Sequence, residues 1–156
     1  MRAYRLVKAD YAPEAFSGRG AALRGGRWNP KGVPAVYASE HLALSVLEWL
    51  AYALEVASLE SYVYFRLEVP SSEVVRAEIP PNWRALPHPP ETQEVGRRLL
   101  VEEGALAFLV PSVLVPEGWN LVLNPKHPAF HLVEVEGPFS LVWDPRVEEL
   151  VRRARG

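Results

Sequence analysis

An arginine within a glycine-rich segment is the first group in this sequence that could do chemistry. Arg27 follows Gly25 and Gly26, and Gly32 ends the segment GGRWNPKG. Glycines let the backbone approach a ligand closely, and the planar fork of an arginine suits a diphosphate or a carboxylate. An arginine in such a loop is more often simply solvated. The spacing alone therefore leaves a ligand role and a surface role open.

A glutamate follows on a helix that the sequence predicts over residues 40–55. The main apolar arc of this helix consists of Leu42, Ala43, Val46, Leu47, Leu50 and Leu54. Glu48 projects from the opposite side, which favours a solvated carboxylate. However, Leu44 and Ala51 flank Glu48 on its own face, at i−4 and i+3, so part of that face is apolar. A carboxylate at the edge of a buried pocket is a candidate functional group, and both interpretations remain open.

Polar side chains also mark the ends of two predicted strands farther along the chain. Ser112 follows one apolar strand, while Asn120 and Asn124 share one face of the next by period-two alternation. Amides on a shared face can hold a ligand. A serine that ends a strand and an Asn-Pro turn are equally common where no ligand binds.

The residue types argue against thiol and metal chemistry. Cysteine is absent, which excludes disulfides, thiolate metal sites and a thiol nucleophile. His127 and His131 have the i, i+4 spacing of a metal-binding pair, but Pro128 between them disfavours a helix. We therefore expect no metal site.

Length and charge indicate one domain over residues 1–156. The chain is 49% apolar, enough to enclose a core. The chain has fourteen arginines and three lysines against 19 acidic residues, so its net charge is close to zero. This balance gives no reason to expect direct nucleic-acid binding. No segment approaches the ~20 apolar residues of a membrane span, and the N-terminus lacks a signal-peptide stretch. We expect a cytoplasmic protein that does not bind membranes.

The elements that must position these groups alternate without a regular βαβ order. The pattern predicts strands at residues 3–7, 34–38, 61–69, 73–79, 105–110, 119–123 and 132–142 and helices at 40–55, at 91–103 and from Pro145 onward. Ser39 stands where the N-cap of the first helix would lie. Residues 18–32 read as an irregular loop, and residues 80–90 as a surface connection. The mixed order predicts a single α+β domain with a mixed β-sheet core and flanking helices.

At the three chemically interesting segments the sequence resembles the RES domain, a bacterial toxin family named for an arginine, a glutamate and a serine. The resemblance covers residues 4–145, and its specific parts are the strings GGRWNPKG, PAVYAS, ALSVLEWL and VPS…NLVLNPKHPAF. The family's arginine falls on Arg27, an accompanying tyrosine on Tyr37, its glutamate on Glu48 and its serine on Ser112. Trp28 stands where some relatives have tyrosine, and still supplies a stacking face.

The resemblance implies a fold similar to ADP-ribosyltransferase toxins and an enzyme that depletes NAD⁺ by breaking its nicotinamide–ribose bond, by hydrolysis or by phosphorolysis. NAD⁺ is then the substrate, and no further cofactor is expected. By hypothesis Arg27 binds diphosphate, Tyr37 stacks on nicotinamide, Glu48 stabilises the sugar cation or orients the nucleophile, and Ser112 hydrogen-bonds the ribose. The predicted NAD-binding residues are Arg27, Trp28, Asn29, Tyr37 and Asn124.

The resemblance also implies a partner, because family members are usually paired with a helix-turn-helix antitoxin that blocks the active site. We expect this inhibition to come in trans, from a separate chain. Two alternatives stay open: an ADP-ribosyltransferase that acts on a protein target, and a non-catalytic NAD-binding module whose arginine and glutamate form a structural ion pair. The sequence does not distinguish water, phosphate and protein as acceptors, and it leaves open whether the chain forms a homo-oligomer.

Overall fold

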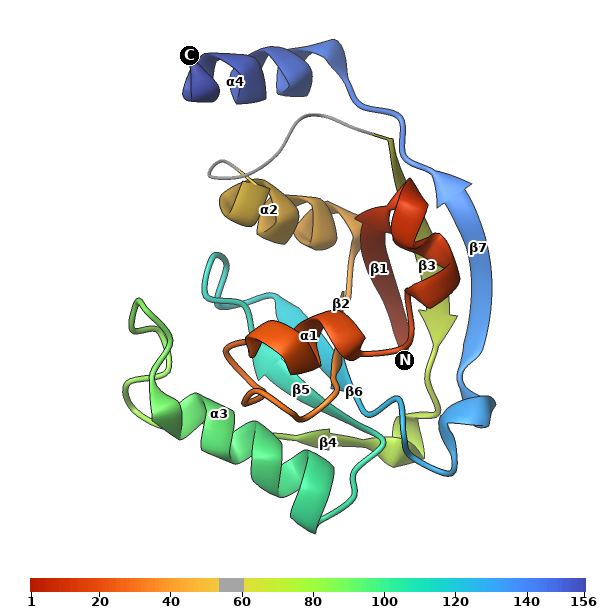
Figure 1. Cartoon of the computed structure of the whole chain (residues 1–156), viewed down its shortest axis with the longest axis vertical. Coiled ribbons are helices and arrows are strands. Elements are labelled where there is room, and N and C mark those ends of the chain that lie inside the picture. The colour runs from red at the N-terminus through yellow and green to blue at the C-terminus, as the bar shows by residue number, and fades with distance from the viewer. Residues whose placement is uncertain (54–60) are drawn as a thin grey trace.

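A twisted sheet organises the molecule (Figure 1), and the described part of the chain contributes seven strands to it. The computed structural model describes residues 1–53 and 61–156. The strand order is β4-β5-β6-β2-β1-β3-β7, and only β4 and β5 are parallel neighbours among the described strands. The strands are β1 (Arg2–Lys8), β2 (Val36–Ser39), β3 (Tyr62–Glu68), β4 (Val74–Arg76), β5 (Ala107–Pro111), β6 (Trp119–Leu123) and β7 (Glu134–Ser140).

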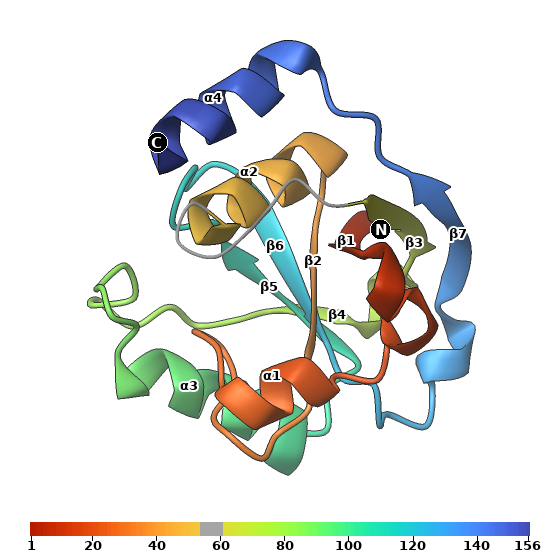
Figure 2. The same ribbon diagram turned by 45° about the horizontal axis from the view of Figure 1, so that its top comes forward.

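Within the described residues, four α-helices lie around this sheet. They are α1 (Arg19–Arg24), α2 (Leu42–Ala53), α3 (Pro90–Arg97) and α4 (Pro145–Arg155), and a π-helical segment, Arg98–Glu102, continues α3. Short 3₁₀ turns occur at Ala9–Glu14, Ser71–Glu73 and Phe130–Leu132. In Figures 1 and 2, α4 lies at the end of the molecule that is nearer α2, away from α3. None of the helices in the described part of the chain is long and apolar enough to cross a bilayer.

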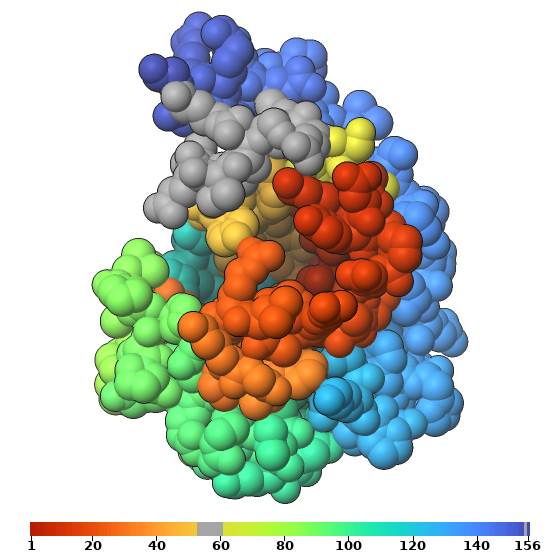
Figure 3. Space-filling view, viewed as in Figure 1, coloured from red at the N-terminus to blue at the C-terminus, as the bar shows by residue number. Residues whose placement is uncertain are grey.

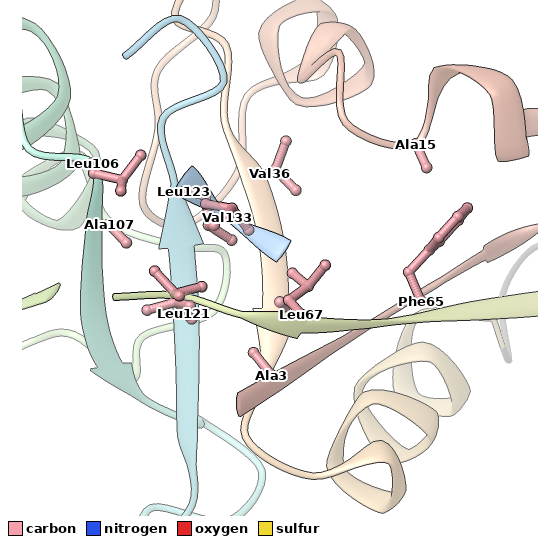
Figure 4. Packing of buried hydrophobic residues seen from close by; sticks show 12 residues of the cluster. Ala3, Ala15, Val36, Phe65, Leu67, Leu106, Ala107, Leu121, Leu123 and Val133 are labelled. Carbon is pink, nitrogen blue, oxygen red and sulfur yellow. The ribbon is translucent and has the colours of Figure 1, made fainter. Parts of the chain in front are cut away.

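The core divides between the two faces of the central strands, because successive side chains of a strand point to opposite faces. Leu121 and Leu123 of β6 belong to one apolar cluster, part of which is shown in Figure 4. Val122, between them, joins a second cluster that contains Phe108 of β5 and Trp28. All of these side chains are buried. Apolar packing on both faces holds β5 and β6 in place. The candidate site lies where β5 ends and β6 begins.

The fold confirms the expected single α+β architecture with a mixed sheet and flanking helices. The strand at residues 119–123 has the predicted bounds. The last helix begins at Pro145, where Asp144 accepts a hydrogen bond from the backbone N–H of Arg146 at 2.8 Å. Proline suits this first turn because it has no N–H that would otherwise need a partner.

Three local predictions were wrong. The segment at residues 18–32 is not wholly irregular, because it contains α1. The second helix begins at Leu42, and Ser39 ends β2 instead of capping it. Its hydroxyl is 2.7 Å from Oδ1 of Asn120 on the neighbouring strand, a partner that the local sequence does not reveal. Residues 54 and 55 of the predicted helix lie outside the described residues.

The predicted inner face of α2 was also wrong. Leu47, a member of the predicted apolar arc, is 40% exposed, whereas Leu44 and Ser45 are buried. The reason is tertiary: the hydroxyl of Ser45 donates a hydrogen bond to the carbonyl oxygen of Tyr4 on β1, which turns that side of α2 toward the sheet. Glu48 lies three residues after Ser45 and therefore shares the inward side.

Candidate active site

A cleft of about 590 Å³ opens between α1 and α2 over the strands β1 and β2. Figure 3 shows the surface hollowed between the orange atoms of α1 and the atoms of α2 behind them. The charged side chains along it are four arginines and two glutamates: Arg5, Arg19, Arg24, Arg27, Glu14 and Glu48. This excess of positive charge favours an anionic ligand.

Glu48 is held in this cleft by two donors. The hydroxyl of Ser112 donates to Oε1 at 2.6 Å, and Nδ2 of Asn120 donates to the same oxygen at 2.8 Å. The glutamate is half-buried on α2, and the donors come from β6 and from the residue after β5. The carboxylate is therefore fixed by groups at the ends of two adjacent strands. The helical wheel favoured a solvated Glu48, and that interpretation was wrong.

Ser112 acts from behind the glutamate. Its side chain is fully buried, and its Oγ accepts the backbone N–H groups of Leu114 at 3.1 Å and Val115 at 3.2 Å. A hydroxyl has one proton and two lone pairs, so these two bonds and the one to Glu48 use all of its capacity. In this arrangement Ser112 positions Glu48, and its predicted bond to a ribose remains a prediction.

Arg27 is anchored to the connection between β4 and α3. Its Nη1 donates to the carbonyl oxygens of Trp83 at 2.7 Å and Ala85 at 2.9 Å. Burial lowers the pKa of the guanidinium, and the charge of Glu48 opposes that effect. An arginine has five N–H donors, so Nε and Nη2 stay available for a ligand in the cleft.

Tyr37 contributes its ring to the cleft and its hydroxyl to the loop that carries Arg27. The hydroxyl donates to Oδ1 of Asn29 at 2.6 Å and accepts the backbone N–H of Trp28 at 3.1 Å. Burial raises the pKa of this phenol above its ordinary value, so the hydroxyl keeps its proton. The side chains of Trp28 and Asn29 are both buried beneath the loop.

Helix α3 braces the same loop from the other side. Nε2 of Gln93 donates to the carbonyl oxygen of Gly26 at 3.1 Å. Gly96 lies so close to Trp28 that a methyl group at residue 96 would be 1.5 Å from the Trp28 carbonyl oxygen. The loop around Arg27 is thus fixed by close packing as well as by hydrogen bonds.

The structure groups the predicted residues into three sets. Arg27, Tyr37 and Glu48 line the cleft, with Ser112 directly behind Glu48. Trp28 and Asn29 support the loop and do not line the cleft, and Asn124 lies at the far end of β6, where its Nδ2 donates to the carbonyl oxygen of Leu100 at 3.3 Å. Ligand binding by Trp28, Asn29 and Asn124 therefore stays a prediction to which this geometry lends no support.

Comparison with known proteins decides the family. The sequence model of the RES domain matches residues 2–144. The chain belongs to the RES domain family. The protein named "Toxin Res" of Yersinia enterocolitica is 37% identical over 95% of this chain and all of its own length. The "Prs ADP-ribosylating toxin" of Sphingobium sp. is 34% identical over 92% of this chain and 91% of its own. These similarities place the chain among the RES-domain toxins.

A solved structure shares the fold of this RES domain. The crystal structure of the M. tuberculosis MbcT–MbcA toxin–antitoxin complex contains a chain that superposes with a TM-score of 0.69 at 17% sequence identity. The match covers 99% of this chain and 88% of that one. The architecture is therefore that of a known toxin fold.

Arg5 of β1, which none of the sequence motifs includes, adds a half-buried cation to the cleft. Nε of Arg5 donates to the carbonyl oxygen of Ala15 at 2.6 Å, and Nη1 donates to that of Tyr37 at 2.9 Å. Burial lowers the pKa of Arg5 to about 10. The sequence does contain a signal for Arg5, because it is a charged residue within the otherwise largely apolar strand predicted at residues 3–7.

Two aromatic residues and a hydrogen bond define the outer part of the cleft. Trp49 and Tyr52 line it from α2, and Arg24 lines it from α1. Nη1 of Arg24 donates to the hydroxyl of Tyr52 at 3.0 Å, which links the two helices across the opening. In the part of the chain that the structure describes, no three His, Cys, Asp or Glu side chains are grouped to hold a metal ion.

Proposed function

We propose that this RES-domain toxin breaks the bond between C1 of the nicotinamide-side ribose and the nicotinamide nitrogen of NAD⁺, by hydrolysis or by phosphorolysis. The observation that carries the proposal is a carboxylate fixed by two hydrogen bonds in a cleft that arginines otherwise dominate. Arginine suits the diphosphate of NAD⁺, and a carboxylate suits the cationic sugar that the reaction forms.

The electron balance explains why a fixed carboxylate suffices. As the bond breaks, its electron pair passes to the positively charged ring, and nicotinamide leaves as a neutral molecule. The ribose acquires oxocarbenium character, which a nearby negative charge stabilises. Water or phosphate then adds to C1, and water releases a proton in doing so. Neither a metal ion nor a covalent intermediate is needed.

The residues take distinct roles in this proposal. Oε1 of Glu48 is occupied by Ser112 and Asn120, so Oε2 is the oxygen that faces the sugar cation. The free donors of Arg27 bind the diphosphate, and the ring of Tyr37 supplies a stacking surface for nicotinamide. The cleft volume of about 590 Å³ lies within the range of small-molecule sites, and the cleft is open to solvent beside Tyr52, which is exposed.

A second candidate is transfer of ADP-ribose to a protein. One of the relatives is named an ADP-ribosylating toxin, which favours this reading for a similar site. The same C1 centre would accept a nucleophile from a protein side chain in place of water or phosphate, so the cleavage step is common to both candidates.

We propose further that an antitoxin chain inhibits this enzyme in the cytoplasm. The related fold occurs in a toxin–antitoxin complex, which supports a partner of that kind. An enzyme that consumes a central cofactor needs such a control. A helix-turn-helix antitoxin would place a carboxylate or a terminal peptide near Arg27, where the guanidinium otherwise meets diphosphate.

One incubation separates the candidates. Purified protein is mixed with NAD⁺ in three arms, in buffer alone, with inorganic phosphate and with a candidate acceptor protein, and the products are identified by mass. ADP-ribose indicates hydrolysis, ADP-ribose phosphate indicates phosphorolysis, and an acceptor heavier by one ADP-ribosyl group indicates transfer. Unchanged NAD⁺ in all three arms would overturn the proposal and favour a non-catalytic binding module.

A further inference from the structure

Asn120 and Ser39 form a cross-strand pair directly beneath Glu48. The two residues are register partners on the antiparallel strands β6 and β2. Oγ of Ser39 lies 2.7 Å from Oδ1 of Asn120, and Nδ2 of Asn120 lies 2.8 Å from Oε1 of Glu48. Ser39 is buried and Asn120 is half-buried, so water competes weakly for these bonds. A continuous chain of hydrogen bonds therefore runs from the sheet to the carboxylate.

The chemistry of the three groups fixes the direction of every bond. Oδ1 of an amide carries no proton, so the hydroxyl of Ser39 must donate to it. The amide then presents its N–H group to Glu48, which as a carboxylate can only accept. A flipped amide would instead set Oδ1 against the carboxylate oxygen. The carboxylate therefore sets the orientation of the amide, and Ser39 secures the other end of that amide by donating to Oδ1.

We infer that Asn120 is a positioning residue for the reaction, fixed by Ser39, and that with Ser112 it selects Oε2 of Glu48 as the reacting oxygen. Both donors converge on Oε1 from adjacent strands, because Ser112 follows β5 and Asn120 pairs with Val110 of β5. A carboxylate held at one oxygen from two directions cannot rotate without losing both bonds. This inference rests on the proposed function and adds to it the residues that orient its carboxylate.

Other charged groups surround Glu48 and set the background for any titration. Those that line the cleft with it are Arg5, Glu14, Arg19, Arg24, Arg27, Tyr37 and Tyr52. Arg27 couples to Glu48 electrostatically. Glu40 accepts the backbone N–H of Trp119, next to Asn120, and Glu117 is exposed in the turn after Ser112. All of these groups are unchanged when Asn120 is replaced, so a difference between variants reports on Asn120.

The test compares Asn120→Ala, Asn120→Asp and a matched control. Asn82→Asp is the control, because the exposed Asn82 also donates to a glutamate, Glu91, at 2.9 Å and does not line the cleft. The first readout is the kcat and KM of NAD⁺ cleavage across pH. The second, which needs no catalysis, is the titration midpoint of the Glu48 carboxyl by ¹³C NMR, with Glu48→Gln identifying the signal.

We expect Asn120→Ala to lower kcat at least tenfold with little change in KM, because a misdirected carboxylate still leaves the ligand contacts in place. Asn120→Asp sets a second negative charge beside Glu48, which disfavours its ionised form. The Glu48 titration and the acid limb of the activity profile should both move to higher pH, by about one unit or more. Asn82→Asp should move neither.

Two results would overturn the inference. One is a Glu48 titration that is the same in wild type, Asn120→Ala and Asn120→Asp. The other is a raised KM with an unchanged kcat in Asn120→Ala, which would make Asn120 a ligand-binding group. If wild-type protein cleaves no NAD⁺, the proposed function fails, while the NMR titration still decides whether Asn120 and Glu48 are coupled.

Discussion

Ser112 donates its only hydroxyl proton to Glu48 at 2.6 Å while its oxygen accepts two backbone N–H groups of the turn that follows β5. The bond joins residues 64 positions apart in the sequence. It joins two of the predicted site residues into one structural unit, in which the serine orients the glutamate.

Replacing Ser112 with alanine should therefore affect catalysis more than binding. We expect kcat to fall about tenfold to a hundredfold with KM nearly unchanged, because the serine is fully buried behind Glu48. Steady-state kinetics with NAD⁺ checks this, and thermal unfolding shows that the variant is folded. A large rise in KM with kcat preserved would instead support the predicted contact between Ser112 and the ribose.

Arg27→Ala and Glu48→Gln should each lower NAD⁺ turnover by at least roughly a hundredfold, the scale of losing a group that stabilises charge in the transition state. Circular dichroism should show both variants folded. Arg2→Ala is the control, since Arg2 is exposed and pairs with Glu68 outside the cleft. Near wild-type turnover in a folded Arg27 or Glu48 variant would show that its assigned role is wrong.

Tyr37→Phe should separate the two functions of this tyrosine. Removing the hydroxyl leaves Oδ1 of Asn29 and the N–H of Trp28 without their partner, so we expect the free energy of unfolding to fall by about 1–3 kcal/mol. Turnover should fall less than in Tyr37→Ala, because the ring that lines the cleft is kept.

Chemical denaturation and turnover assays measure both effects, and Tyr11→Phe, at an exposed tyrosine, is the control that should change neither. Equal and severe loss of turnover in Tyr37→Phe and Tyr37→Ala would contradict the stacking role and assign the function to the hydroxyl.

Two glycine-to-alanine changes should have opposite effects on stability. Gly96→Ala puts a methyl group against the Trp28 carbonyl, and we expect it to lower the free energy of unfolding by about 2 kcal/mol or more. Gly20→Ala meets no atom within 4 Å on α1 and should raise stability by up to about 1 kcal/mol, because alanine favours a helix. Melting temperatures compare the two, and a Gly96→Ala protein as stable as wild type would disprove the close packing of α3 on the Arg27 loop.

Expression of the wild-type chain without an antitoxin should arrest growth and lower cellular NAD⁺, whereas chains with Arg27→Ala or Glu48→Gln should not. A cognate antitoxin should compete with NAD⁺ for the cleft, which a shift of its inhibition constant with NAD⁺ concentration would measure. Normal growth with unchanged NAD⁺ during wild-type expression would count decisively against a toxin of this kind.

The sequence by itself determined the fold class, and it supplied the candidate chemical groups. Period-two apolar runs such as residues 119–123 are local signals, and the observed β6 has the same bounds. Pro145 marked the start of the last helix for an equally local reason, its missing N–H. Family motifs selected Arg27, Glu48 and Ser112, because a motif preserves residue type and order.

Only the tertiary structure decided which way those groups face. A helical wheel ranks the faces of α2 by hydrophobicity alone, and it turned Glu48 outward. In the fold, Ser45 bonds to β1, and Glu48 receives donors from residues 64 and 72 positions away. Arg27 is likewise anchored to a carbonyl 56 positions away. Such bonds join segments that are neighbours only after folding, so no periodicity within one segment can encode them.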